Sequence, residues 1–282
     1  MQVAVPYDQV AYRGFIAELP NQLGRWTTVD VPTSNVTWHN QALGGGGSIT
    51  AIQAADAKDG GGFIDFTPGL GARSSGTPAW NVLASASAGY TIMFWMRTGT
   101  IPVNGYSFFD LRSNAAGTHN EVVLIRLDQG GVFEVLTLSP TQTPATVDYR
   151  DGSHLDINDV YAAEPVLENN QWHFVAIVKS TVSEWSVLYI DGDVRQEQEP
   201  GNGIQIDTVD WGTARIEFGR SIGDLGAATL WPGDNYAGGM ADFAIIGDPL
   251  TSVQVRDAYR AAVPKSAVVG GLSAVGSISR GG

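Results

Sequence analysis

The chain has 282 residues, of which 43% are hydrophobic and only 16% are charged, and it carries 35 glycines and 13 prolines. This composition favours many short strands joined by turns, and the length suits one large β domain with an extension. The 29 acidic residues outnumber the 16 lysines and arginines, for a formal charge of -13. Such a balance repels phosphate backbones, so we expect no nucleic-acid partner.

Two further absences narrow the class of protein. The sequence has no cysteine, which excludes disulfides and thiolate metal sites, so hydrophobic burial has to stabilise the fold. No window approaches the roughly 18 apolar residues of a membrane-spanning helix, and Met1–Ala17 has no basic segment followed by an apolar run. We therefore expect no membrane insertion and no secretory signal. A protein of this kind that works outside the cell would leave it by lysis, by a removed signal or by a dedicated secretion system.

Residues 1–61 show no sustained hydrophobic period. Three prolines and two glycine runs interrupt them: Pro6, Pro20, Pro32, 44–47 and 60–62. The glycine runs lack a following Lys-Thr pair or helix, so they are predicted to be hinges. The sequence thus predicts an N-terminal extended arm or small β extension, with short strands around Trp26 and Trp38.

The middle of the chain has the pattern of strands. Residues 63–66 form a short strand, and residues 90–97 are apolar on both faces. A strand of the second kind belongs in the middle of a sheet that is covered on each side. Residues 121–127 and 132–138 flank a glycine-rich turn at 128–131, which predicts a hairpin.

The strand pattern continues toward the C-terminus. Residues 171–179 and 184–191 form a second hairpin, and two further strands follow at 214–219 and 240–247. A long loop at 220–239 separates these two strands. Such a loop in a compact domain is usually functional or interfacial.

One segment has a helical pattern. Thr251 caps residues 252–262, whose apolar side chains fall mainly on one face, and a proline stands two residues beyond. Residues 265–282 then form a Gly/Ser-rich tail. The predicted organisation is an arm (1–61), a β domain with one short C-terminal helix (62–264) and this tail.

Five segments follow one another in an order typical of one family. They are residues 90–98, 171–178, 188–193, 216–219 and 237–245, and a helix comes after them. In this order they resemble the laminin G-like, concanavalin A-like jelly-roll family. The resemblance implies an all-β, antiparallel two-sheet jelly-roll sandwich, a fold used mainly for binding.

The same resemblance raises the question of calcium. Residues 105–109, followed by Asn120, resemble the segment where pentraxins hold calcium ligands. Pentraxins add an acidic cluster from a later loop, where this chain offers only Asp224. Calcium takes six to eight oxygens, so the resemblance implies at most a weak site made by Asn120 and Asp224 with backbone carbonyls and water. The alternative is that both are solvated loop residues.

The long loop contains the best candidate for ligand contact. Its members are Trp231, Asp234, Asn235 and Tyr236. Flat aromatic faces stack on sugar rings, and Asp and Asn exchange hydrogen bonds with hydroxyls, so the segment suits a glycan. The alternative is that Trp231 and Tyr236 fold back over the end of the sandwich or contact another subunit.

We find no pattern of an enzyme in the sequence. Glucanase relatives of the fold carry a Glu-x-Asp-x-Glu or Glu-x-Asp-x-x-Glu strand, which is absent here, as are a Gly-x-Ser-x-Gly elbow and a phosphate loop. The four histidines have no metal-ligand spacing, and Trp95, Trp172 and Trp185 lie in apolar strands, where we expect them in the core. The sequence therefore predicts a protein that binds and does not catalyse.

Three functional hypotheses follow. The first is a structural protein on a virion surface, such as a bacteriophage head decoration, fibre or tail component. It would contact other virion proteins or itself as a homo-oligomer, a dimer or trimer, and would adhere to host glycans. The second is a free-standing, extracellular, lectin-like carbohydrate-binding module. The third, a glycoside hydrolase, lacks a visible carboxylate pair.

Overall fold

The computed structural model describes residues 8–26, 37–39, 48–51, 56–58, 63–66, 72–74, 89–101, 106–115, 118–128, 132–138, 167–180, 186–198, 214–219 and 234–263. In several strands the described part is the backbone path alone. Within these residues the chain forms two helices, one 3₁₀ turn and sixteen strands arranged in two sheets.

The first sheet, called sheet A, has eight strands among the described residues. Seven follow one hydrogen-bonded order: β13 (Asp193–Gln198), β12 (Ser186–Ile190), β11 (Trp172–Ser180), β7 (Gly89–Thr98), β16 (Gly238–Ile246), β5 (Phe63–Phe66) and β4 (Asp56–Lys58). The eighth, β1 (Gln22–Trp26), pairs with the second half of β16, whereas β5 pairs with its first half. All of these pairings are antiparallel.

The second sheet, called sheet B, also has eight described strands. Their order is β10 (Val132–Leu138), β9 (Thr118–Asp128), β8 (Tyr106–Ala115), β14 (Ala214–Phe218), β6 (Ala72–Ser74), β3 (Ser48–Ala51) and β2 (Thr37–His39). The short β15 (Asp234–Asn235) runs parallel to β8 beyond the end of β14. The predicted antiparallel two-sheet sandwich is confirmed, and so are both predicted hairpins.

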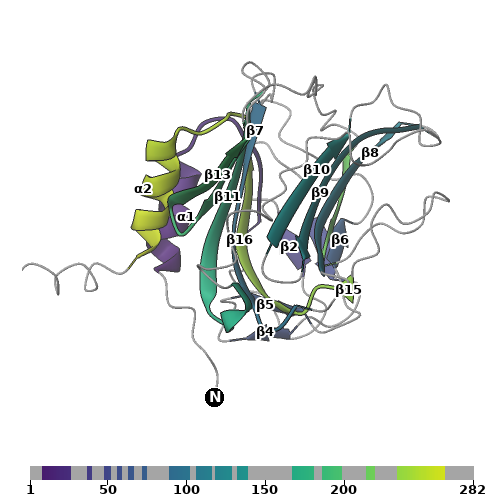
Figure 1. Cartoon of the computed structure of the whole chain (residues 1–282), viewed down its shortest axis with the longest axis horizontal. Coiled ribbons are helices and arrows are strands. Elements are labelled where there is room, and N and C mark those ends of the chain that lie inside the picture. Colours follow the sequence, from purple (N-terminus) through teal and green to yellow (C-terminus); the bar gives the residue numbers. More distant parts are fainter. Residues whose placement is uncertain are drawn as a thin grey trace, which may run out of the picture.

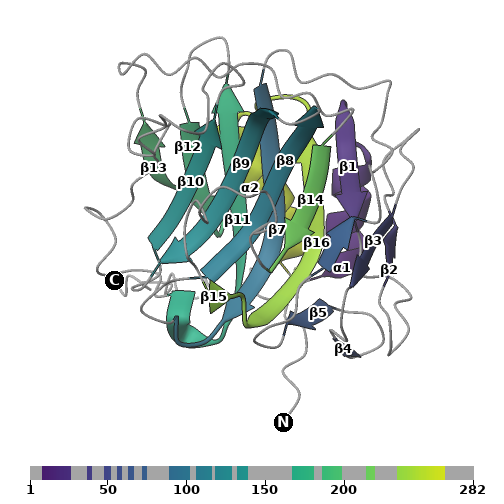
Figure 2. The ribbon, with the colours of Figure 1, turned by 90° about the vertical axis from the view of Figure 1, so that its right-hand side faces the viewer.

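The molecule has three layers. Helices α1 (Gln9–Ala17) and α2 (Ser252–Ala262) lie on the face of sheet A that points away from sheet B (Figure 1). Turning the molecule shows the two sheets one behind the other (Figure 2). Sheet A is therefore covered on both faces, which explains why β7 and β11 are buried along almost their whole length. The prediction that residues 90–97 lie mid-sheet is confirmed.

A core of large apolar side chains holds the helices to sheet A. Tyr12 of α1 packs edge-on against Trp95, with ring centroids 6.1 Å apart, and Trp95 lies 5.5 Å from Phe174. Tyr259 of α2 stacks on Trp95 at 6.1 Å. Trp95 and Trp172 are buried, as predicted, while Trp185 lies outside the described residues. Aromatic burial at this interface stabilises a chain that has no disulfides.

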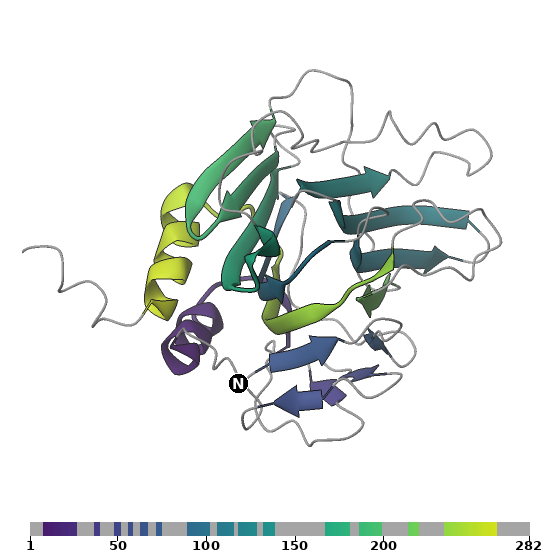
Figure 3. The ribbon, with the colours of Figure 1, turned by 60° about the horizontal axis from the view of Figure 1, so that its bottom comes forward.

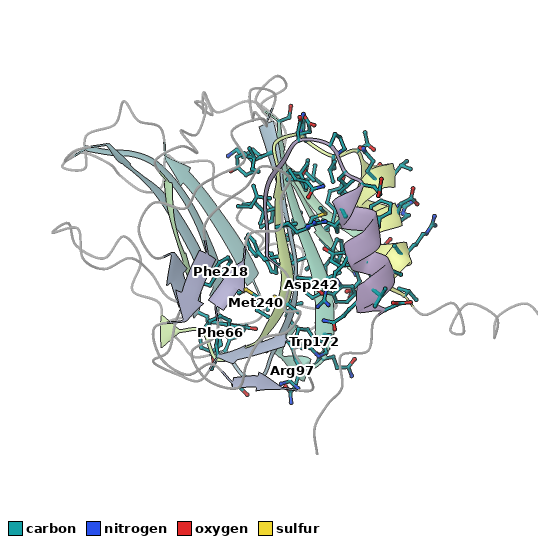
Figure 4. All side chains as sticks on the ribbon, turned by 180° about the vertical axis from the view of Figure 1, so that it is seen from behind. Phe66, Arg97, Trp172, Phe218, Met240 and Asp242 are labelled. Atoms are coloured by element: carbon teal, nitrogen blue, oxygen red, sulfur yellow. The ribbon has the colours of Figure 1, made fainter. Side chains whose placement is uncertain are left out.

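The helix α1 was not predicted. Its backbone begins beside the end of α2, because the Asp8 amide donates to the Ala262 carbonyl oxygen at 2.7 Å, and the two helices run side by side (Figure 3). The Arg13 guanidinium donates to the buried Asp242 carboxylate at 2.7 Å. Figure 4 shows Asp242 on the helix side of sheet A, and Phe218 and Met240 between the sheets.

The described part of residues 1–61 adds a helix and strands to the sandwich, as in the alternative of a small β extension, and does not form an extended arm. Its helix lies in the core, and its strands pair with strands from the rest of the chain: β1 with β16, β4 with β5, and β3 with β6. The boundary predicted between residues 61 and 62 thus falls inside one sandwich. Short strands do occur around Trp26 and Trp38, as predicted.

The C-terminal helix agrees with its prediction. It spans Ser252–Ala262, and the Thr251 hydroxyl caps it by accepting from the Gln254 amide. Neither described helix is long and apolar enough to cross a membrane. The predicted tail, residues 265–282, lies outside the described residues.

Candidate functional site

The long loop between β14 and β16 is closed at its base by Tyr236. The Tyr236 amide donates to the Gly219 carbonyl oxygen at 2.8 Å, so the two ends of segment 219–236 are held together. Its hydroxyl lies 2.8 Å from the Arg97 carbonyl oxygen and 3.0 Å from that of Gly239. The ring is fully buried, with centroids 5.7 Å from Phe66 and 5.6 Å from Tyr106. The loop therefore starts and ends on a rigid part of the sandwich.

Close backbone packing completes this base. A Cβ at Gly238 would collide with the Arg97 carbonyl oxygen and with the Tyr236 hydroxyl, so only glycine fits there. Asp234 and Asn235 form β15, which pairs with Tyr106 and Ser107 of β8. The loop is thereby attached to both sheets.

The structure corrects one of the predicted ligand contacts. Tyr236 has no exposed surface and its hydroxyl is bonded to backbone, so its ring offers no face to a sugar. The alternative, that it folds back over the end of the sandwich, is the one observed. Asp234 and Asn235 are placed by their backbone only, and Trp231 lies outside the described residues.

The two predicted calcium ligands are not brought together within the described part of the chain. Asn120 lies in β9 next to His119, which pairs with Asn114 near one end of β8. The segment leading to Asp224 leaves β14 after Phe218, nearer the other end of β8. Asp224 itself lies outside the described residues, and the described ones contain no group of three metal-binding side chains. The calcium site stays a prediction.

A polar cluster near the end of β11 has a structural explanation. His173 is buried, and its Nδ1 and Nε2 lie 2.8 Å from Asp191 Oδ2 and 3.2 Å from Asn169 Oδ1. The other Asp191 oxygen accepts from the Phe174 amide at 2.9 Å. These bonds tie the 3₁₀ turn η1 (Leu167–Asn169) to the turn between β12 and β13. Each polar atom of the cluster serves the fold.

The inward and outward faces of sheet B follow from two buried side chains. Phe218 of β14 is fully buried and meets Phe243 of sheet A edge-on at 4.7 Å, and Tyr106 of β8 is buried against Tyr236. Side chains alternate along a strand, so the strand pairings assign every other position to one face. Most inward positions in register with these residues are apolar, namely Phe109, Leu111, Val123, Ile125, Leu127, Phe133, Val135, Ala214 and Ile216, and two are polar, Ser113 and Thr137.

The outward face of sheet B is different. Its positions in β6, β8, β9, β10 and β14 include four arginines, four carboxylates and five aliphatic residues: Arg73, Asp110, Arg112, Val122, Leu124, Arg126, Asp128, Val132, Glu134, Leu136, Leu138, Arg215 and Glu217. No described helix or strand packs on this face, whereas two helices cover the corresponding face of sheet A (Figure 1). Antiparallel sheets commonly have one face packed on the core and one face toward solvent.

Pairing across β8 and β14 places like charges opposite each other. Arg112 lies opposite Arg215, and Asp110 lies opposite Glu217. On the far side of β14, Glu217 lies opposite Arg73. Each arginine also has a carboxylate two residues away on its own strand and another diagonally across, so the four positions alternate in charge along both strands. The sequence alone did not reveal this arrangement, because residues 110–112 and 215–217 lie about a hundred positions apart.

Comparisons with known proteins agree with this architecture. Residues 71–256, more than half of the chain, match the family Laminin_G_3, described as the concanavalin A-like lectin/glucanases superfamily. No curated protein matches the sequence. The receptor-binding domain of botulinum neurotoxin C/D mosaic serotype has a TM-score of 0.56 and 14% identity, over 85% of this chain and 51% of that one.

Two further solved structures are similar. The binding domain of botulinum neurotoxin DC in complex with SialylT has a TM-score of 0.56 and 13% identity, over 86% of this chain and 51% of that one. Trypanosoma rangeli sialidase has a TM-score of 0.51 and 9% identity, over 86% of this chain and 33% of that one. The chain thus spans about half of the toxin domains and a third of the sialidase, and at these identities the likeness is one of fold. By its family match, the chain belongs to the concanavalin A-like lectin/glucanase superfamily, with a laminin G-like jelly roll.

Proposed function

We propose that this chain is a carbohydrate-binding module that binds through the outward face of sheet B and the loop at 220–235. The observation that carries the proposal is the difference between the two outer faces of the sandwich. Helices cover the outer face of sheet A. The outer face of sheet B combines charged and aliphatic positions, and no described helix or strand covers it. The family, which includes lectins, supports the same function. So do two similar structures, the binding domain of botulinum neurotoxin DC in complex with SialylT and Trypanosoma rangeli sialidase in complex with sialic acid.

The loop contributes aromatic and polar groups from a rigid base. It starts at Gly219 and returns at Tyr236, and both ends are held by the hydrogen bond between these two residues. A loop fixed at its ends loses less conformational freedom on binding than one that is free there. Trp231, Asp234 and Asn235 are the residues we propose for sugar contact from this loop.

The test is a glycan array followed by titration monitored by tryptophan fluorescence. We expect the full chain to bind at least one oligosaccharide and Trp231→Ala to weaken that binding about tenfold or more, since stacked aromatic contacts dominate sugar recognition. Val253→Ala is the control, because Val253 lies on α2, on the other side of the molecule, and is 63% exposed. Absence of binding to every glycan would contradict the proposal.

A second candidate function comes from the paired carboxylates. Asp110 and Glu217 lie opposite each other, a placement that the sequence pattern did not reveal and that resembles the acid pair of a glycosidase. However, Arg112 and Arg215 stand two residues away along the same strands, and Arg73 lies opposite Glu217. The acid pair of a glycosidase is defined by the distance between its carboxyl groups, and the strand pairing fixes only the register of these two residues, so we propose binding without cleavage.

Incubation of the full chain with the bound glycan, with release of reducing ends as the readout, separates the two functions. Cleavage that is lost in both Asp110→Asn and Glu217→Gln would establish the hydrolase.

The virion role, the homo-oligomeric state and the virion-surface location are inferred from the sequence and stay predictions. Light scattering after size-exclusion chromatography of the full chain measures the oligomeric state.

A further inference from the structure

We propose that a second copy of this chain pairs with the outer edge of β10, so that the sheets B of two copies join into one continuous sheet. The proposal concerns the assembly of the chain and does not depend on its carbohydrate-binding function. It is carried by the backbone path and the sequence of β10, the strand at which sheet B ends in the described part of the chain (Figure 2).

The first argument is that β10 lacks the features that keep the edge of a sheet from pairing. Natural edge strands are protected by charged side chains, prolines, bulges or short length. The strand β10 has the sequence VFEVLTL, with one charged residue in seven and no proline or glycine. All seven residues pair with β9 in consecutive register, so no bulge interrupts the strand. A regular, mostly apolar edge strand of this kind is a template on which another strand can pair.

The other edge strands of the described part of the chain differ from β10. In sheet A, β13 carries three charged residues in six and has a register shift in its pairing with β12. Two of the three residues of β4 are charged, and the pairing of β1 with β16 also contains a register shift. In sheet B, β2 has only three residues. Length, regularity and sequence therefore single out β10 for pairing with another chain.

The second argument concerns the occupant, and it comes from pairing β10 with itself. Antiparallel pairing of two identical strands about a two-fold axis is a closed contact that uses the same surface on both copies. With the axis at Val135, Val132 lies opposite Leu138 of the partner subunit, and only this register gives all seven residues a partner. Odd-numbered positions then pair with odd-numbered ones, so residues that share a face keep that face across the contact. The inward row that includes Phe133 and Val135 thus continues from one copy into the other.

The charge pattern of β10 also suits self-pairing in this register. The one charged residue, Glu134, lies opposite Leu136 of the partner subunit, so no like charges stand opposite each other across the contact. Within its own sheet Glu134 is in register with Arg126 of β9. The contact therefore adds little repulsion, although the chain as a whole carries a formal charge of -13.

The geometry of such a pair has a consequence for binding. Two antiparallel strands of one continuous sheet are related by an axis perpendicular to the sheet, so the outward faces of both copies point to the same side. On the proposed function, the dimer presents two carbohydrate-binding faces to one glycan-bearing surface. The second face then binds at a high effective concentration, which raises the overall affinity for that surface.

The test uses the full chain and two variants of one residue. Sedimentation velocity over a range of protein concentrations gives the dissociation constant of the dimer for the parent, Leu136→Glu and Leu136→Lys. Residue 136 lies opposite Glu134 of the partner subunit, so the first variant creates two like-charge pairs across the contact and the second creates two opposite-charge pairs. We expect the parent to dimerise, Leu136→Glu to raise the dissociation constant about tenfold or more, and Leu136→Lys to lower it or leave it unchanged.

The two variants control for each other, because both place a charge at the same position of the outward face. A dimer that Leu136→Glu weakens and Leu136→Lys keeps supports the contact and its register. A parent that stays monomeric at every concentration overturns the proposal. So does a dimer whose dissociation constant is the same in both variants, because that dimer uses another surface.

Amide hydrogen exchange of the parent distinguishes a second copy from cover by the chain itself. If a second copy occupies the edge, exchange of the amides at 132–138 slows as the protein concentration rises. Slow exchange that does not change with concentration would show that the same chain covers the edge, and it would overturn the proposal. This measurement needs no substitution, so it decides the question even where a variant lowers stability.

Discussion

Lys179 shows what burial does to a single ionisable residue. It lies near the end of β11 opposite Tyr90, and only 2% of its surface is exposed. Its neighbours two positions apart, Ile177 and Val175, share its face, while Phe174, Ala176 and Val178 belong to the core under the helices. Burial lowers the pKa of Lys179 from 10.5 to about 7, because the charged form loses its hydration.

This shift predicts a pH dependence of stability. Between pH 7 and 10.5 the unfolded chain binds a proton at Lys179 that the folded chain lacks, so the folded state gains stability as the pH rises, and below pH 7 this contribution is constant. We expect Lys179→Met to be more stable than the parent at pH 7, by a margin that narrows toward pH 10. The difference in the free energy of unfolding between the two proteins changes by at most about 1.4 kcal/mol per pH unit. Urea unfolding of both proteins at several pH values measures it, and a margin independent of pH would contradict it.

At the scale of elements, α1 is attached to sheet A by an ion pair as well as by its apolar face. Asp242 has a left-handed backbone (φ 49°) at the bulge in β16, where the register with β7 shifts. Its carboxylate accepts from the Arg13 guanidinium at 2.7 Å and from Gln9 Nε2 at 3.3 Å. The bulge thus turns a carboxylate toward the helix, and its burial makes the pair sensitive to loss of either partner.

Asp242→Asn tests this attachment. Asparagine tolerates the left-handed backbone but removes the charge, so we expect the free energy of unfolding to fall by roughly 2 kcal/mol. Asp257→Asn is the control, because Asp257 forms only an exposed pair with Arg260 at 3.8 Å and should change stability by less than about 0.5 kcal/mol. Chemical denaturation measures both, and equal effects would show that the Arg13–Asp242 pair contributes little.

At the scale of the whole molecule, segments from both ends of the chain complete one sandwich. The helix α1 and strand β1 come from the first 26 residues, and they cover the outer face and one edge of strands that end at residue 246. Tyr12 and Ile16 are fully buried in that interface. The domain is therefore not contained in residues 62–264, although the strand pattern alone suggested so.

A deletion experiment checks this integration. We expect residues 62–264 on their own to aggregate or to unfold without cooperativity, because Trp95 and Phe174 lose the cover of Tyr12. Residues 8–263, which keep both helices and the Asp8 to Ala262 bond, should unfold cooperatively near the temperature of the full chain. Circular dichroism during heating measures both, and a cooperative transition of residues 62–264 would show that α1 is dispensable.

Strands, hairpins and helices were predictable wherever the residues that specify them lie close together in the sequence. The strand 90–97, both hairpins and the helix after Thr251 depend on hydrophobic period, turn residues and a cap, and the structure has all of them. The spacing of Tyr12, Phe15 and Ile16 also carried the signal of α1, because it places apolar residues on one helical face. Prolines and glycines farther along obscured it.

The sequence by itself determined the all-β class, the strands buried on both faces and the capped C-terminal helix, because these depend on neighbours a few residues apart. Only the tertiary structure decided which strands pair, and with that the Arg112–Arg215 and Asp110–Glu217 partners on one open face. It also decided that Tyr236 anchors the loop from inside and offers no face to a ligand. Alternation along a strand tells which residues share a face, but the partner across the sheet depends on burial summed over the whole chain.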